Sequence, residues 1–242
     1  MILRSITKHV KDQNWFAVGL DFFIVVAGIL IAFQITNWNE RRQEFHKQQL
    51  IETRLQSDFD VIEDALTIAI SEHDGLVVAL EVLRTSLKRG KVRPEDEAAI
   101  KLALRNGFQY WHFSHRSGTF IELLSSGRLD LISDEESRLT LIRYDRVSQE
   151  TRFNLEQIRN NLHPDVPKFL LYRKLGRLMR GENGQIIFSP IVEYDIEGMA
   201  ADKEFVSVVD QMFEMQTWVQ SNMNSLLEEL YIVIEILNRP PD

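Results

Sequence analysis

The stretch WFAVGLDFFIVVAGILIAFQI, residues 15–35, decides which fold the rest of the chain can have. It carries one formally charged side chain, Asp21, and is otherwise almost wholly apolar. At a rise of ~1.5 Å per residue, a helix over these residues is roughly 30 Å long. That length matches the hydrocarbon thickness of a lipid bilayer. We therefore predict a transmembrane helix at residues 15–36, a short basic segment at 1–14 and a soluble domain at 37–242.

A cleaved signal peptide and a buried core helix are the two alternatives for such a stretch. A signal peptide has an apolar region of about 7–15 residues that ends in a small-x-small cleavage site. Here the run is longer and ends in FQITNW, residues 33–38, which holds no such site. Trp15 and Trp38 lie at its two ends, where indole rings favour the membrane interface. These features favour a retained membrane helix anchored by the two tryptophans.

One face of the predicted membrane helix suggests association with a partner helix. Asp21, Val25, Gly28 and Ala32 follow a 4-3-4 spacing and share this face. Gly28 and Ala32 form a small-xxx-small pair, which lets two helices approach closely, so we expect a homo-oligomer. Asp21 either faces the partner helix, as in an oligomeric ion-conducting protein, or reaches headgroup water near the end of the span. Association through Gly28 and Ala32 is compatible with both.

The orientation in the membrane is not decided by the flanking charges. The positive-inside rule compares Lys and Arg in the two flanks, and here they tie. The flanking cations are Arg4, Lys8 and Lys11 before the span, and Arg41, Arg42 and Lys47 after it. An uncleaved N-terminal anchor followed by a long domain most often exports that domain, and this is the orientation we expect.

Composition excludes several classes of protein. The formal net charge is −8, so the chain has no basic footprint for nucleic acid, and no nucleic-acid partner is expected. It has no cysteine, which excludes disulfides and thiolate metal sites. No phosphate-binding loop, dinucleotide fingerprint, H-E-x-x-H motif or EF-hand loop occurs, so neither a cofactor nor a metal is expected. The low content of proline and glycine, 6 and 11 residues, favours a helical domain.

A second apolar pattern, with steps of three and four residues, follows the membrane stretch. Such steps are typical of a coiled coil or a bundle helix. Its members are Ile51, Leu55, Phe59, Ile62, Leu66, Ala69, His73, Leu76, Leu80, Leu83 and Leu87. We therefore expect the membrane helix to continue to Lys88, with a break near Asp74-Gly75 as an alternative. Gly90 is expected to end it.

Local signals place the remaining helices. Pro94 suits a first helical position, Ser133 to Glu136 forms a capping box, and the hydroxyl-rich turns at 117–119 and 125–127 are expected to cap helices. The expected helices cover 94–107, 119–126, 133–163, 168–179 and 202–237, with a loop at 180–197 that holds a short extended piece at 186–188. The apolar faces of the two longest comprise Leu139, Ile142, Val147, Leu155 and Ile158, and Phe205, Val209, Phe213, Trp218, Met223, Leu227, Leu230, Ile234 and Leu237. These elements predict an all-α fold, an up-and-down bundle with stalk-like first and last helices.

Two stretches carry a resemblance to a known family. DFFIVVAGILIAFQITNWNE, residues 21–40, resembles the N-terminal signature of bacterial single-pass membrane proteins of unknown function, in which an acid and an apolar run precede GILIALQINNWNE. GTFIELLSSGRLDLISDEESRLTLIRYD, residues 118–145, is similar to the family's SG-x-Leu-x-Leu-Ile segment and the helix after it. The resemblance implies a bacterial inner-membrane location and this architecture, but no reaction. With the expected export, the domain lies on the periplasmic side.

Three groups of residues were weighed as binding or catalytic sites. His112 and His115 have the spacing of a helical metal pair, but no acid or cysteine nearby completes a set. Arg105 and His112 resemble the Arg-x(4–6)-His pattern of HEPN-type ribonucleases, which implies His112 as acid or base and Arg105 as a phosphate contact. A basic cluster that could contact anionic lipid comprises Lys168, Arg173, Lys174, Arg177 and Arg180. Ordinary surface or core positions explain all three groups more simply.

The sequence therefore predicts a non-enzymatic single-pass membrane protein with a helical-bundle domain. Sensing, scaffolding or the assembly of membrane complexes are the functions expected, with the lipid bilayer, a second copy of the chain and other membrane proteins as partners. A membrane-anchored HEPN-like nuclease and an ion-conducting oligomer that uses Asp21 remain the alternatives.

Overall fold

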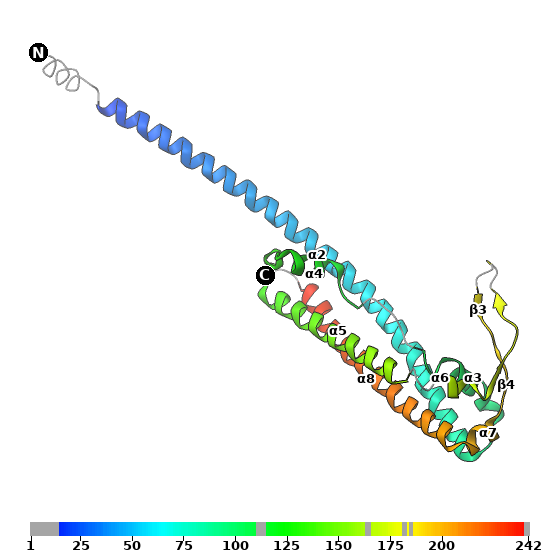
Figure 1. Ribbon diagram of the computed structural model, residues 1–242. Helices are drawn as coiled ribbons and strands as arrows, with labels where there is room; N and C mark the ends of the chain where they lie inside the picture. Colours follow the sequence, from blue (N-terminus) through cyan, green and yellow to red (C-terminus); the bar gives the residue numbers. More distant parts are fainter. Residues whose placement is uncertain (1–14, 110–114, 163–165, 181–182, 184–185, 240–242) are drawn as a thin grey trace, which may run out of the picture. The chain divides into compact units, whose positions relative to one another are not determined.

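The computed structural model describes the backbone of the chain except at residues 1–14, 110–114, 163–165, 181–182, 184–185 and 240–242 (Figure 1). The protein divides into two compact units, Met1–Ile51 and Glu52–Asp242. The fold is all-α, as predicted, with four short strands among the described residues. The elements are α2 Trp15–Arg89, the 3-10 turns η1 Pro94–Asp96 and η2 Leu129–Leu131, α3 Glu97–Asn106, α4 Gly118–Ser126, α5 Glu135–Leu162, α6 Val166–Leu170, β1 Arg173–Leu175, β2 Met179–Arg180, β3 Ile186–Phe188, β4 Ile191–Tyr194, α7 Ile196–Ala201 and α8 Lys203–Leu237.

Helix α2 runs for 75 residues without interruption. It ends as predicted: Gly90 has a φ of +65°, a left-handed conformation that glycine adopts without strain. The alternative of a break near Asp74-Gly75 is wrong, because both residues are helical. His73 and Leu76, on either side of this dipeptide, are buried, so packing holds the helix together across its glycine.

The core of the second unit lies between α2 and α8. Every member of the predicted α2 stripe from Ile51 to Leu87, His73 included, is buried. Gln56 donates a 2.8 Å hydrogen bond to the Leu237 carbonyl, whereas Arg84 donates one of 2.7 Å to Asp210. Partner numbers fall on α8 as they rise on α2, so the two helices are antiparallel. Asp202 caps α8 by accepting from the Glu204 and Phe205 amides, which confirms the predicted start of that helix.

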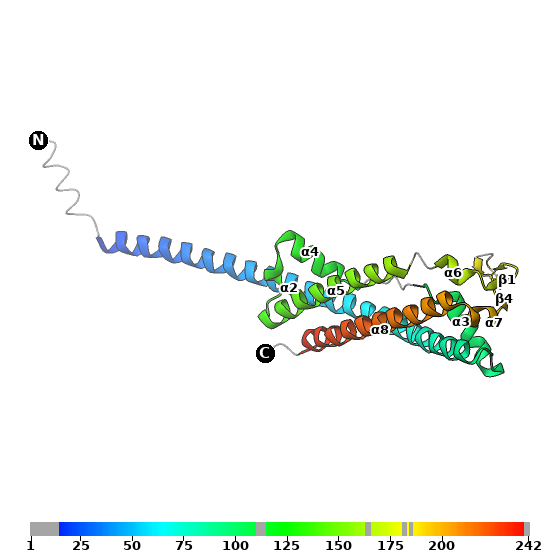
Figure 2. The ribbon, with the colours of Figure 1, turned by 60° about the horizontal axis from the view of Figure 1, so that its bottom comes forward.

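The third long helix, α5, packs along α8 (Figure 2) but buries a different face from the one predicted. Leu139 and Ile142, members of the expected apolar face, are 58% and 44% exposed and therefore lie outside the core. The buried residues of α5 are Ser137, Leu141, Tyr144, Asp145, Ser148, Thr151 and Ile158. A core face rich in hydroxyl groups is stable only where those groups find partners, and a hydrophobic pattern cannot reveal it. Trp218, on the expected apolar face of α8, is 57% exposed and likewise lies outside the core.

The start of α5 differs by one residue from the predicted capping box. The Asp134 carboxylate, rather than the Ser133 hydroxyl, accepts a 2.7 Å hydrogen bond from the Ser137 amide. Hydrogen bonds from Ser137 therefore hold the pKa of Asp134 below its ordinary value. The helix gains both a cap and a negative charge at its positive end.

The segment after α5 contradicts the expected helix over residues 168–179. A short helix, α6, is followed by an antiparallel pairing of β1 with β4 and of β2 with β3. Gly176, just after β1, allows this segment to lie close to β4, because a Cβ at Gly176 would lie 2.6 Å from the Val192 side chain. The extended piece at 186–188 is confirmed as β3, while β4 and α7 were missed. Without sustained apolar alternation, short strands of this kind leave little trace in a sequence.

Candidate functional site

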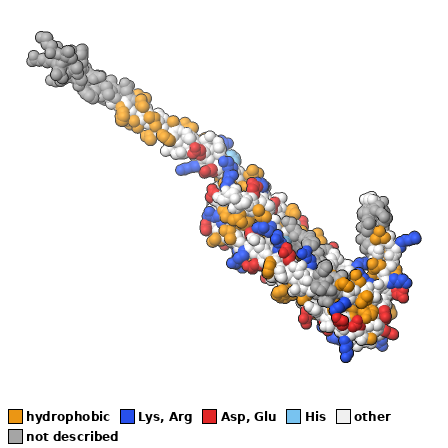
Figure 3. Space-filling view, in the orientation of Figure 1, with side chains coloured by type: hydrophobic (Ala, Val, Ile, Leu, Met, Phe, Trp, Pro, Cys, Tyr) orange, Lys and Arg blue, Asp and Glu red, His pale blue; other side chains and the backbone are white. Residues whose placement is uncertain are grey.

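The first functional feature is the apolar part of α2. The described helices include one that is long and apolar enough to cross a membrane, near the N-terminus. The most apolar stretch of this helix has a mean hydropathy of 1.6, and none of that stretch is buried within the structure. Large apolar side chains lie exposed along it: Leu20, Phe22, Phe23, Ile24, Val25, Ile29, Leu30, Ile31, Phe33 and Ile35. Figure 3 shows hydrophobic side chains along α2 after the grey residues. In water so many exposed apolar groups are unfavourable, so this surface fits an apolar surrounding.

The predicted membrane-helix residues lie as follows. Gly28 and Ala32 are exposed on α2, and a Cβ added at Gly28 would meet no atom within 4 Å. Both are therefore available to a neighbouring helix. Trp15 and Asp21 lie within α2, but their side chains are outside the description. Trp38 is exposed, and the Arg42 guanidinium lies 5.8 Å from the centre of its ring.

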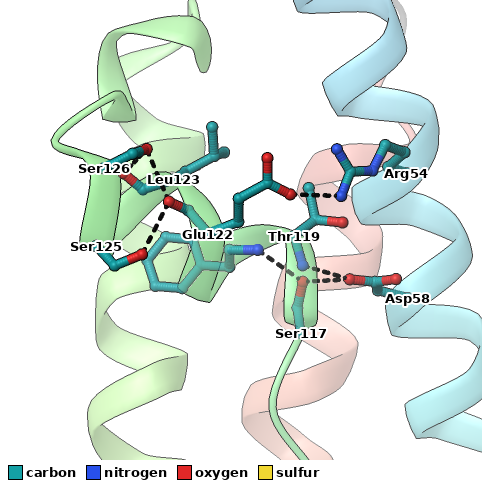
Figure 4. A network of polar contacts seen from close by, with 9 residues as sticks. Arg54, Asp58, Ser117, Thr119, Glu122, Leu123, Ser125 and Ser126 are labelled. Carbon is teal, nitrogen blue, oxygen red and sulfur yellow. Dashed lines mark hydrogen bonds and ion pairs between the residues drawn. The ribbon is translucent and has the colours of Figure 1, made fainter.

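The second feature is a polar anchor that fastens the segment before α4 to α2 (Figure 4). The Asp58 carboxylate accepts hydrogen bonds from the Ser117 hydroxyl at 2.7 Å and from the Thr119 amide at 2.9 Å. The Ser117 hydroxyl in turn accepts from the Phe120 amide, so it caps α4, as predicted for this turn. Burial acts to raise the pKa of Asp58, but these hydrogen bonds outweigh it and hold the pKa below 3.8.

The same segment is held from α5. The Tyr144 hydroxyl and the Ser148 hydroxyl both donate to the His115 carbonyl, at 2.8 and 3.1 Å. The Arg116 guanidinium donates to Asp145 at 2.7 Å. The segment from His115 to Thr119 is therefore clamped between two long helices. Each of these polar groups holds a backbone group, a hydroxyl or a neighbouring charge of the same domain.

A buried polar relay forms the third feature. His73 Nε2 lies 2.8 Å from the Gln216 carbonyl, and Gln216 Nε2 donates to the Gly107 carbonyl at 2.7 Å. The relay links α2, α8 and the end of α3. Because a carbonyl oxygen only accepts, His73 donates from Nε2, and burial lowers the pKa of the imidazole. Sequence reasoning identified His73 only as the polar member of its stripe, and missed Gln216.

The catalytic and metal candidates are not assembled by the described residues. Arg105 lies in the last turn of α3, which ends at Asn106, so that helix does not extend to His112. His112 itself lies outside the described residues. His115 is buried. Within the described part of the chain, no group of three His, Cys, Asp or Glu side chains could hold a metal ion.

The basic cluster is partly neutralised within the domain. Lys168 pairs with Glu204, and Lys174 lies 3.3 Å from Glu193. Arg173 donates to the Leu104 carbonyl at the end of α3. These contacts account for three of the five cations without an external anion.

The chain matches no protein-family model, no curated protein and no solved structure.

Proposed function

We propose that this chain is a non-enzymatic single-pass membrane protein whose helical domain acts in scaffolding, sensing or the assembly of membrane complexes. The observation that carries the proposal is the exposed apolar segment of α2 from Phe22 to Ile35. A buried core helix would have its apolar side chains covered, and here they are not. A bilayer is the surrounding that this segment's length and composition fit.

Helix continuity argues against a cleaved signal peptide. α2 extends from the apolar segment through Trp38 and into the core stripe without a break. Signal peptides end at a small-x-small cleavage site, and the apolar run here, which ends in FQITNW, has none. Retention of the segment therefore makes it an anchor, and Gly28 with Ala32 provides the surface through which anchors of two copies associate.

The polar clusters of the domain support a role in assembly rather than catalysis. Asp58, Asp145 and Tyr144 hold one segment in place, and their hydrogen bonds are satisfied within the domain. A rigid helical domain on a membrane anchor presents surfaces to partners in the same membrane. The location that we propose is the bacterial inner membrane, with the domain on the periplasmic side.

Reporter fusions after Asp242 test the location. A periplasm-active reporter is expected to be active there and a cytoplasm-active one silent. The same pair fused after Lys11 is expected to give the reverse pattern, which controls for reporter export. Two reporters active on the same side at both positions would contradict a single span. A cytoplasmic domain with a single span would correct the orientation alone.

A further inference from the structure

The buried polar relay of His73, Gln216 and Gly107 joins three helices inside the second unit. His73 is 1% exposed and Gln216 is fully buried. Gly107, at the end of α3, lies directly against α8, because a Cβ at this glycine would lie 2.7 Å from the Met212 sulfur. The end of α3 therefore packs on α8 through its backbone, and the hydrogen bond from Gln216 to the Gly107 carbonyl holds it there.

Two atoms of this relay have hydrogen-bonding capacity that the domain does not use. In the part of the chain that the structure describes, neither His73 Nδ1 nor Gln216 Oε1 has a hydrogen-bond partner. Because His73 donates from Nε2, Nδ1 of the neutral ring is an acceptor, and the amide oxygen of Gln216 is an acceptor as well. Buried polar atoms are normally paired, so two orphaned acceptors in one relay call for an explanation. A proton at Nδ1 would convert one of them into a donor.

The charges around His73 offer an imidazolium ion little compensation. Asp74 is its neighbour on α2 and acts to raise the pKa of His73, but this carboxylate is exposed and already accepts a 2.6 Å hydrogen bond from Gln220 of α8. The side chains three and four positions from Gln216 on α8 are uncharged. The charged residue in the last turn of α3 is Arg105, a cation. Burial therefore outweighs the attraction of Asp74, and the pKa of His73 lies below its ordinary value.

We propose that His73 and Gln216 form a pH-sensitive latch that releases the end of α3 from α8 when His73 takes up a proton. The proton comes from solvent and adds an N–H group at Nδ1, for which Gln216 Oε1 is the unfilled acceptor of the relay. When the Gln216 amide turns its oxygen to the imidazolium ion, its nitrogen leaves the Gly107 carbonyl. One hydrogen bond forms as the other breaks.

The release is confined to the end of α3. The apolar stripes of α2 and α8, and the hydrogen bonds that join these helices on either side of the relay, do not involve His73 or Gln216. All three members of the relay lie within the unit Glu52–Asp242. The inference therefore stands whether or not the apolar segment of α2 spans a membrane.

The direction of the pH dependence follows from the burial of His73. An imidazole that reaches water has a pKa of about 6.5, whereas the closed latch holds the pKa of His73 below its ordinary value. The closed form is therefore fully favoured above that pH and loses its advantage as the pH falls. For a closed form that binds no proton, the equilibrium constant for opening rises about tenfold between pH 7.5 and pH 5.5.

Thiol labelling measures the release, because the chain has no cysteine of its own. Ala103→Cys places a thiol at a buried position in the last turn of α3. Ser221→Cys, at an exposed position of α8, corrects for the effect of pH on thiol reactivity. In the full chain in detergent, the labelling rate at position 103 relative to position 221 should rise by up to about tenfold from pH 7.5 to pH 5.5. Met223→Cys, buried on α8, should stay protected at both pH values.

Two substitutions that cannot titrate assign the effect to His73. In His73→Leu and in His73→Gln, the relative labelling of Ala103→Cys should no longer change with pH. Gln216→Leu removes the hydrogen bond to the Gly107 carbonyl and should raise the relative labelling already at pH 7.5. Circular dichroism at both pH values confirms that each variant is folded.

Three results would overturn the latch. The first is a relative labelling rate at Ala103→Cys that stays constant with pH in the unaltered background. The second is a rise in acid that persists in folded His73→Leu and His73→Gln. The third is a parallel rise at Met223→Cys, which would show that acid loosens the whole domain rather than the end of α3. Unchanged labelling in Gln216→Leu would likewise contradict the role of the Gly107 contact.

Discussion

Two apolar segments of the same helix differ in what surrounds them. From Phe22 to Ile35, α2 is apolar on every side and none of its described side chains is buried. From Ile51 to Leu87 it is apolar mainly on one face, and that face is buried. A helix that is apolar all round belongs inside a membrane or a large core, and a one-sided helix belongs at a protein surface. The placement of polar residues, more than total hydrophobicity, therefore identifies the environment of each segment.

The largest expected effect comes from shortening a buried side chain. Leu66 is fully buried, so Leu66→Ala should lower the free energy of unfolding of the helical domain by about 2–5 kcal/mol. Leu30→Ala, in the exposed segment, should leave it unchanged. Urea unfolding of the full chain in detergent, followed by circular dichroism, measures both. Equal losses of unfolding free energy in Leu66→Ala and Leu30→Ala would contradict the view that only the second segment packs in the core of the domain.

A charge in the apolar segment should affect membrane insertion instead. Leu30→Arg is expected to make insertion less favourable by about 2.5–3.5 kcal/mol, the penalty for an arginine at the centre of a span. The fraction of the protein that resists alkaline carbonate extraction from membranes should fall. Val61→Arg, at an exposed position of the domain, is the control and should be retained as well as the unaltered chain. Loss of retention in both variants would point to misfolding rather than to the membrane.

Removing the charge of Asp58 in the polar anchor should lower the free energy of unfolding by less than Leu66→Ala does, and this loss should depend on pH. Asp58→Asn keeps the acceptor oxygen but loses its charge, and charged hydrogen bonds exceed neutral ones by about 1 kcal/mol. The pKa of Asp58 in the folded protein lies below 3.8, so its contribution is complete above pH 3.8 and is lost as the pH falls further. Chemical unfolding at pH 7 and at pH 3 should therefore show a difference between Asp58→Asn and the unaltered chain that shrinks in acid. Asp60→Asn, at an exposed position two residues along the same helix, should show no such difference at pH 7.

Removing the exposed ion pair next to the polar anchor should change the free energy of unfolding least. Arg54 lies 2.6 Å from Glu122, but their side chains are 43% and 60% exposed. Exposed pairs of this kind typically contribute about 0.2–1 kcal/mol, and Arg54→Ala should lower the free energy of unfolding by an amount near the bottom of that range. Unfolding in high salt gives a second check, because salt screens exposed charges and should reduce the difference in stability between Arg54→Ala and the unaltered chain. A loss as large as that of Asp58→Asn would show that the two contacts act as one unit.

The helices were predictable where local signals decide them. The glycine that ends α2, the Ser117 turn before α4 and the Asp202 cap of α8 each act within one helical turn, so the sequence alone locates them. The face of α5 was not predictable, because the burial of Ser148 depends on the His115 carbonyl, 33 positions away. The strands after α6 likewise depend on pairing between distant residues, which a single sequence does not specify.

The candidate site was predictable only in part. The apolar run at residues 15–35 identifies directly the segment of α2 that is long and apolar enough to cross a membrane. Asp58 could not be singled out, because its partners lie 59 and 61 positions along the chain and are ordinary in composition.

Labelling of single cysteines along α2 tests the central claim most directly. The chain offers a cysteine-free background for Ile24→Cys, Ile31→Cys, Asn39→Cys and Ser71→Cys. In intact membranes a water-soluble maleimide should fail to label the first two positions and should label the last two, and all four should react after denaturation. Equal labelling at Ile31→Cys and Ser71→Cys in intact membranes would contradict a membrane span.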